Sequence, residues 1–239
     1  MNIITRIARA IREYFKKEED NPTTEFFYNE NELDLEAFNR NYSPPLVIKT
    51  QATDRRITFE FIPEKQNFKN VRSALQFIEG DWKGWKKIRD QEEAKSNGAC
   101  CICSRKSQDY IAESKTATEC HEVWSFANGV QTLERLEALC VLCHQIKHIN
   151  RFTNDKDYTE KLLQRYCDIN DISMSVALQD LENAKNEKVN RKHLQYKLDL
   201  SLINEIYKPN TFPDLFNPHT EDFNYFLEHD FKKNKNIEE

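Results

Sequence analysis

Two Cys-x-x-Cys pairs constrain this 239-residue chain more than any other feature of its sequence. The first pair is Cys100 and Cys103, and the second is Cys140 and Cys143. Two cysteines on a tight turn present their sulfurs to one side of a small ion, and two such turns complete a tetrahedral zinc cage. The gap between the pairs exceeds the spacing of about 15–20 residues in a simple zinc ribbon. We therefore expect a structural zinc site with a folded insertion, such as a hairpin; the alternative is four ordinary buried cysteines.

The number of cysteines and the absence of long apolar runs indicate the cellular compartment. Seven cysteines is an odd number, which suits metal binding in a reducing compartment better than a framework of disulfides. No apolar run approaches the roughly 20 residues that a membrane span needs. The first residues also lack the pattern of a secretory signal. We expect a cytoplasmic protein without a membrane span.

Composition and charge limit the fold class and the partners. Only four glycines are present, so we expect much of the chain to be helical; with the strands predicted below, the expected fold is α+β and mainly helical. The net charge of −5 argues against a broad basic face that coats nucleic acid. Between residues 83 and 115, eight basic residues stand against five acidic ones. That local excess indicates either a nucleic-acid contact or a solvated helix face.

The organisation of the chain predicts five regions: an amphipathic N-terminal helix (1–20), a strand and helix region (21–98), a zinc and metal domain (99–152), a helical region (153–208) and an aromatic-rich tail (209–239). The N-terminal helix has an isoleucine-rich face opposite a basic face. Such a helix can dock on the body, on a partner protein or on a second copy, or it can lie on a membrane surface. We favour docking.

Apolar periodicity predicts the individual elements. Alternation predicts strands at 46–50 and 57–61, joined as a hairpin, and a late strand at 195–202. Helical spacing predicts helices at 70–96, with a break at Gly80, and at 157–167 and 173–192. Trp82 and Trp85 follow the apolar stripe of the first helix, so we expect them in the core; stacking on bases is the alternative.

Three histidines indicate a second metal site. His144 and His148 are four residues apart after Cys143, so on a helix both imidazoles can reach one ion. Cys143 and His144 are neighbours and would point about 100° apart, so we do not expect them to share a metal. His121 would supply a third ligand from the insertion. The alternative is that these histidines are exposed or are hydrogen-bonded core residues.

The order of these motifs resembles a known nuclease family. Residues 119–122 (Glu-Cys-His-Glu) look like a strand that enters a hairpin, and the helix with His144 and His148 follows. Over roughly residues 100–152, this arrangement closely resembles the HNH (ββα-metal, treble-clef) endonuclease motif. The resemblance implies a ββα-metal core with a zinc knuckle and flanking helices. It also implies that His121, His144 and His148 bind a catalytic Mg²⁺, Mn²⁺, Ni²⁺ or Zn²⁺ ion.

The chain departs from the HNH motif at two positions. Glu122 stands where the family has its general-base histidine, and a glutamate can act as a base if burial raises its pKa. Another register would make His121 itself the base, with Cys120 at the preceding ligand position. Arg135 stands where the motif has its asparagine, and it could hold a phosphate or brace the hairpin loop.

The resemblance therefore implies a metal-dependent endonuclease that hydrolyses phosphodiester bonds in DNA, most simply a duplex. By analogy, a role in restriction, phage defence or a mobile element follows. Arg135 and four lysines would hold the DNA backbone: Lys83, Lys86, Lys87 and Lys106. Two other functions stay open. One is a catalytically silent zinc module that binds nucleic acid or a partner protein, and the other is a membrane-associated adaptor that uses the N-terminal helix.

Overall fold

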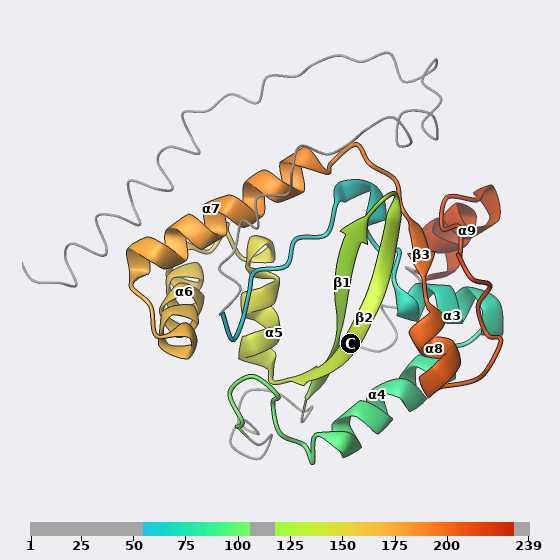
Figure 1. The fold of residues 1–239 in the computed structure, drawn as a ribbon, viewed down its shortest axis with the longest axis horizontal. Helices are drawn as coiled ribbons and strands as arrows, with labels where there is room; N and C mark the ends of the chain where they lie inside the picture. Colours follow the sequence, from blue (N-terminus) through green and yellow to red (C-terminus); the bar gives the residue numbers. More distant parts are fainter. Residues whose placement is uncertain (1–54, 106–117, 232–239) are drawn as a thin grey trace, which may run out of the picture.

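A long β-hairpin stands between two groups of helices in the computed structural model, which describes residues 55–105 and 118–231 (Figure 1). The protein is α+β and mostly helical, as expected. The hairpin consists of β1 (Glu119–Ala127) and β2 (Val130–Leu139), and a short parallel strand, β3 (Lys197–Asp199), completes a mixed sheet. The predictions for residues 1–20, residues 46–50 and Lys106 lie outside the described residues.

The turn of the hairpin determines its register. Asn128 and Gly129 both have positive φ angles, 52° and 72°, which suits the tight turn that joins two antiparallel strands. The register then pairs His121 with Glu137 and Glu119 with Leu139, with one irregularity between Val123 and Trp124. The insertion between the two cysteine pairs thus contains a folded hairpin, as the spacing predicted.

The helices on one side of the hairpin follow it in the sequence. They are α5 (Val141–Lys147), a 3-10 turn η3 (Ile149–Arg151), α6 (Lys156–Asn170) and α7 (Met174–Asn190). These helices confirm the two predicted at 157–167 and 173–192. Their apolar faces form one core, in which Tyr166 of α6 stacks on Phe59 with ring centroids 4.1 Å apart.

The prediction of a strand at 57–61 is wrong, although the predicted alternation holds. Ile57, Phe59 and Phe61 are buried in the core of α5 to α7, but the segment forms no strand. Its backbone bonds to helices instead. Ile57 and the amide side chain of Asn170 exchange two hydrogen bonds of 3.1 and 3.0 Å, and Glu60 N–H donates to the Lys147 carbonyl at 2.8 Å. The apolar alternation correctly predicted which side chains are buried, but it does not indicate whether the segment pairs with a strand or packs on helices.

The helices on the other side of the hairpin come from both ends of the described chain. They are α3 (Val71–Glu79), α4 (Lys83–Lys95), α8 (Ser201–Ile206) and α9 (Glu221–Phe226), with the short turns η1 (Glu64–Gln66) and η4 (Leu227–Phe231). Gly80 confirms the predicted break, since its φ of 76° ends α3 in the left-handed conformation. Trp85 packs on this second core, whereas Trp82 is 40% exposed, so the core prediction is wrong for Trp82.

The late strand is shorter than predicted. Tyr196, Leu198 and Leu200 alternate into the core as expected, but β3 stops at Asp199. The Asp199 carboxylate accepts a hydrogen bond from Ser201 N–H at 3.1 Å, and α8 begins there. The aromatic residues beyond 209 return to the body, where Phe223 of α9 meets Phe77 of α3 edge to face.

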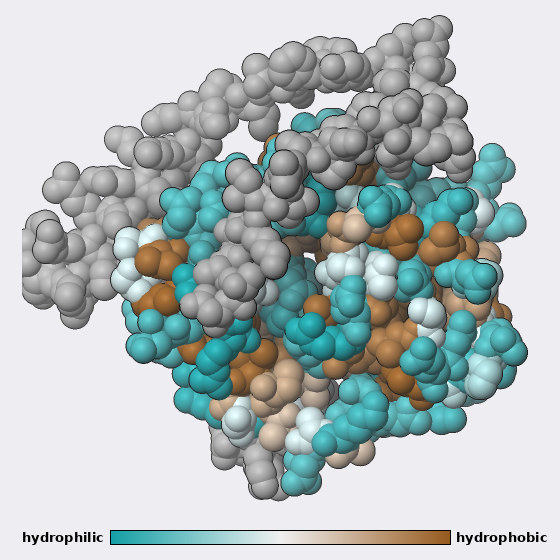
Figure 2. Space-filling view, in the orientation of Figure 1, coloured by the Kyte–Doolittle hydropathy of each residue, from teal (hydrophilic) through white to brown (hydrophobic). Residues whose placement is uncertain are grey.

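The surface is polar with scattered apolar residues. Figure 2 shows hydrophobic side chains reaching the surface in separate patches among hydrophilic ones on both sides of the hairpin. None of the helices that the structure describes combines the length and apolar character that crossing a lipid bilayer requires.

His219, which lies just before α9, is expected to make the stability of the fold sensitive to acid. Lys69 Nζ donates to His219 Nδ1 at 2.6 Å, and His219 Nε2 donates to the Tyr196 carbonyl at 3.2 Å. Burial, and then the charge of Lys69, lower the pKa of His219 from 6.5 to about 4. Between these values the unfolded chain binds a proton that the folded chain does not, so stability falls as pH falls through this range.

We therefore predict that His219→Gln reduces the loss of unfolding free energy between about pH 7 and pH 4.5 by about 1–2 kcal/mol, a value discounted for partial solvent contact. Urea unfolding at the two pH values measures this. The exposed His193→Gln serves as the control and should leave the difference unchanged. An unaltered pH dependence in His219→Gln would contradict the prediction.

Candidate metal centres

The four cysteines converge at the base of the hairpin. The Sγ atoms of Cys100, Cys103, Cys140 and Cys143 all lie within 4.8 Å of one another. Cys103 and Cys140, one from each pair, have sulfurs 3.7 Å apart. Four thiols in one cluster are the donor set of a structural zinc site, and the four residues are those that the spacing predicted.

Backbone hydrogen bonds place the two halves of this cluster. The first half is a tight turn in which Ser104 N–H donates to the Cys100 carbonyl at 2.8 Å. Cys101 N–H donates to the Ala138 carbonyl at 3.0 Å, which ties this turn to the end of β2. Cys140 follows β2 directly and is the N-cap residue of α5. Hydrogen bonds from the Cys140 and Cys143 thiols lower the pKa of Cys100, and the bonds to Cys100 raise the pKa of Cys140 and of Cys143. The cluster thus holds one thiolate on its own, and metal binding would release the protons of the other thiols.

Removal of one cluster cysteine should cost both zinc and stability. We predict that Cys143→Ser loses the tightly bound zinc and lowers the melting temperature by roughly 10 °C or more, because metal binding contributes directly to folding. Zinc analysis of the purified protein and thermal unfolding measure the two effects. Cys101→Ser is the control, since Cys101 is exposed and lies outside the cluster. Zinc retained at full occupancy in Cys143→Ser would refute the four-cysteine assignment.

The three predicted histidines also come together. His121 projects from β1, while His144 lies in α5 and His148 is its C-cap residue. The ring centroids form a nearly equilateral triangle with sides of 5.1, 5.0 and 4.9 Å. One nitrogen from each ring lies within 4.8 Å of the other two. Three imidazole nitrogens on one small ion are a donor set that suits Zn²⁺ and other divalent transition metals.

Burial differs among the three rings. The His121 side chain is 3% exposed and that of His144 is 23% exposed, so the group is closed on the β1 side and reaches solvent on the α5 side. Burial lowers the pKa of His121, and burial together with the charge of His144 lowers the pKa of His148 to about 2. Both rings are therefore neutral near neutral pH, which is the state that binds a metal.

Two carboxylates contact these histidines from outside the triangle. His121 Nε2–H donates to Glu60 Oε2 at 2.8 Å, and His144 Nδ1–H donates to Glu119 Oε2. Carboxylates that accept the second ring N–H of a metal-binding histidine orient the ring and increase its basicity. Glu119 belongs to the Glu-Cys-His-Glu motif at residues 119–122. Nothing in the local sequence pointed to Glu60, which lies far earlier in the chain.

Glu60 also begins a buried chain of alternating charges. Lys147 Nζ, whose side chain is 3% exposed, binds Glu60 Oε1 and lies 3.2 Å from Glu137 Oε2. Arg135 Nη2 lies 2.6 Å from Glu137 Oε1 at the exposed end. Burial would raise the pKa of Glu60, but the hydrogen bond from His121 and the charge of Lys147 outweigh it and lower that pKa to about 2. Arg135, predicted as a phosphate ligand or loop brace, is held by Glu137.

The row of alternating charges from Glu60 to Arg135 predicts that two similar substitutions lower the free energy of unfolding by different amounts. Lys147→Met leaves two largely buried carboxylates without their shared cation and should lower the free energy of unfolding by about 3–5 kcal/mol. Arg135→Met removes the same kind of charge from an exposed position and should cost less than about 1 kcal/mol. Denaturant unfolding at neutral pH compares the two variants. Equal costs would show that the buried ammonium has no special role.

The structure does not bring Glu122 to the histidines. Neighbouring residues of a strand point to opposite faces, and Glu122 points toward α3 rather than α5. Its carboxylate accepts hydrogen bonds from Val71 N–H at 3.1 Å and from Trp124 Nε1 at 3.2 Å. Burial raises the pKa of Glu122 to about 7, which is the range that a general base needs. Its carboxylate, however, accepts from the first backbone N–H of α3 and is not near the histidines. His121, the base of the alternative register, is buried against Glu60.

The predicted DNA-binding lysines of α4 are also separate from the histidines, because α4 packs on the other side of the hairpin from α5 (Figure 1). Lys83 lies 3.1 Å from Asp81, Lys86 pairs with Asp90, and Lys87 lies over the Tyr207 ring. Acidic partners therefore offset part of the local positive charge that the sequence suggested.

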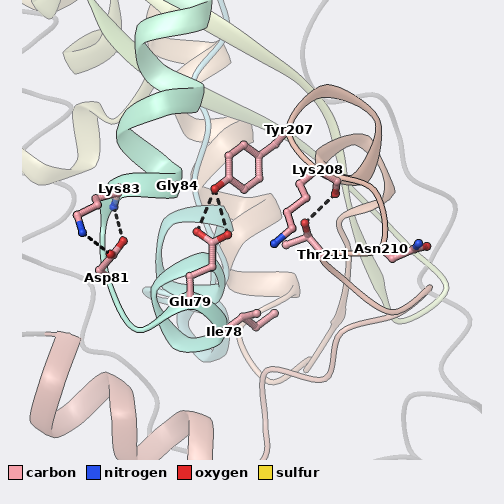
Figure 3. Close-up of a pocket in the computed structure, with 9 residues that line it drawn as sticks. All are labelled: Ile78, Glu79, Asp81, Lys83, Gly84, Tyr207, Lys208, Asn210 and Thr211. Atoms are coloured by element: carbon pink, nitrogen blue, oxygen red, sulfur yellow. Dashed lines mark hydrogen bonds and ion pairs between the residues drawn. The ribbon is translucent and has the colours of Figure 1, made fainter.

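Lys83 lines an open surface hollow of about 540 Å³ between the α3–α4 corner and the loop after α8 (Figure 3). Figure 3 shows Tyr207 directed at Glu79, with hydrogen bonds of 3.0 and 3.2 Å. Thr211 Oγ1 donates to the Lys208 carbonyl at 2.7 Å. The Tyr207–Glu79 contact joins the loop to α3, and the Thr211–Lys208 bond lies within the loop. The hollow is therefore a structural junction and not part of the candidate metal centres.

Arg151 is a further residue that sequence reasoning missed. It ends η3, three residues after His148, and its N–H donates to the His148 carbonyl at 3.0 Å. The hydrogen bond from His144, and then the charges of His144 and Arg151, lower the pKa of Glu119. The guanidinium therefore lies close enough to the histidines to influence their surroundings.

Comparison with known proteins found no matching family model, no matching curated protein and no matching solved structure. The assignment of two candidate metal centres therefore rests on the geometry of this chain alone.

Proposed function

We propose that this protein is a metal-dependent endonuclease of the HNH type that hydrolyses phosphodiester bonds in DNA. The observation that carries the proposal is the convergence of His121, His144 and His148 where a β-hairpin meets the following helix, beside a four-cysteine cluster. Both the order of elements and the order of ligands agree with the HNH motif that the sequence resembles.

The residues around the histidines have separate tasks in this proposal. The three imidazoles hold a divalent ion, which supplies stabilisation of phosphate charge and lowers the pKa of a coordinated water. Glu119 orients His144 at the solvent side of the group. Arg151, whose charge acts on Glu119, would contact a phosphate oxygen of the DNA backbone. Glu122 has no part in the chemistry, because it caps α3 on the other face of β1.

The test is nicking of supercoiled plasmid by metal-stripped protein resupplied with Mg²⁺, Mn²⁺, Ni²⁺ or Zn²⁺. We predict that His144→Ala abolishes metal-dependent nicking and that Arg151→Ala lowers the rate by about 10-fold or more. Glu122→Gln should retain activity, because its carboxylate faces away from the histidines. Zinc content and circular dichroism confirm that each variant keeps the four-cysteine site and the fold. Loss of activity in Glu122→Gln alone would reverse the assignment of roles.

A second candidate function is a catalytically silent zinc module that binds nucleic acid or a partner protein. The specific observation in its favour is that neither predicted base, Glu122 or His121, is placed to activate water among the described residues. A wild-type protein that is inert with every metal and holds a single tight zinc would select this candidate.

A further inference from the structure

Glu60 connects the histidine group to a segment that precedes it by about sixty residues in the sequence. Its carboxylate bridges two groups, accepting from His121 Nε2–H at 2.8 Å through one oxygen and from Lys147 Nζ through the other. Its own N–H donates to the Lys147 carbonyl at 2.8 Å. Both the backbone and the side chain of Glu60 are thus held against α5.

The segment around Glu60 is also held at its start. Ile57 and Asn170 of α6 exchange two hydrogen bonds, and Ile57, Phe59 and Phe61 are buried in the core of α5 to α7. A carboxylate fixed at both its backbone and its side chain can impose an orientation on the ring that it contacts. The position of His121 therefore depends on the packing of a distant segment, not only on β1.

A neutral imidazole has one N–H and one free lone pair. Because Nε2 of His121 donates to Glu60, the lone pair that can bind an ion is on Nδ1. The ring of His144 has the opposite arrangement, since its Nδ1–H donates to Glu119 and Nε2 is left for the ion. The two hydrogen bonds thus assign different ligand nitrogens to two histidines of one site.

We propose that Glu60 is a positioning residue that makes His121 bind the second metal ion through Nδ1 and sets the affinity of that site. The inference rests on the ion-binding part of the proposed function, and it is independent of whether DNA is cleaved. Outer carboxylate partners of this kind typically change metal affinity by about 10–100-fold.

The nitrogen that binds the metal can be observed directly. Long-range ¹H–¹⁵N spectra of the full-length, zinc-loaded protein with labelled histidine distinguish a metal-bound Nδ1 from a metal-bound Nε2, with His121 assigned by comparison with His121→Gln. We expect Nε2 of His121 to carry the proton and Nδ1 to carry the zinc. Zinc on Nε2 would overturn this inference and leave the proposed function intact. A protein that binds only the four-cysteine zinc would overturn both.

Affinity for the second ion tests the positioning role with a matched control. Glu60→Gln should weaken binding of the second Zn²⁺ or Co²⁺ by about 10–100-fold in chelator competition. Glu137→Gln removes the other carboxylate from the same Lys147. Glu137 lies opposite His121 on β2 but binds Arg135 and Lys147, and the His121 ring donates to Glu60 instead, so this variant should change the affinity by less than about 3-fold. Equal losses in the two variants would overturn the proposal, because they would trace to the shared lysine. The spectra of the wild-type protein decide the question even where a variant folds poorly.

Discussion

The register of the β-hairpin is the constraint on which both metal centres depend. The Asn128–Gly129 turn, together with the irregularity between Val123 and Trp124, sets the pairing that faces His121 toward α5; β2 ends at Leu139, directly before Cys140. Because side chains alternate along a strand, a shift of one residue would turn His121 to the α3 side and bring Glu122 to α5. The same shift would move the start of α5 relative to the first cysteine turn. The turn and the irregularity in β1 together therefore position both candidate sites.

The buried charge chain adds a second constraint. Lys147 is almost fully buried, and its ammonium is offset by Glu60 from an early segment and by Glu137 from β2. A buried ion of this kind is costly unless it is paired, so it favours the one arrangement in which α5, β2 and the early segment meet. His121 lies at one end of this row of charges, and the solvent-exposed Arg135 lies at the other end. Structural order and the orientation of a metal-binding ring are thus maintained by the same contacts.

Sequence reasoning identified the candidate ligands because a metal-binding motif has a short-range pattern. The Cys-x-x-Cys spacing and the His144–His148 pair follow from the geometry of turns and helices, and the structure assembles these residues as expected. The helices and the break at Gly80 were also readable from local periodicity and turn chemistry. The prediction of a strand at 57–61 was wrong because alternation indicates only that one side of a segment is buried, not that its backbone pairs with another strand. Here the segment packs on helices, and its backbone bonds to Asn170 and Lys147.

The sequence by itself determined which side chains are candidate metal ligands, since ligand chemistry and spacing are local properties. Only the tertiary structure decided what surrounds them. It placed Glu60 on His121 and turned Glu122 toward α3, and it separated the lysines of α4 from the histidines. These outcomes depend on strand register and on contacts between segments far apart in the chain. No periodicity within a single segment encodes either of them, because long-range packing selects the partner of each buried charge.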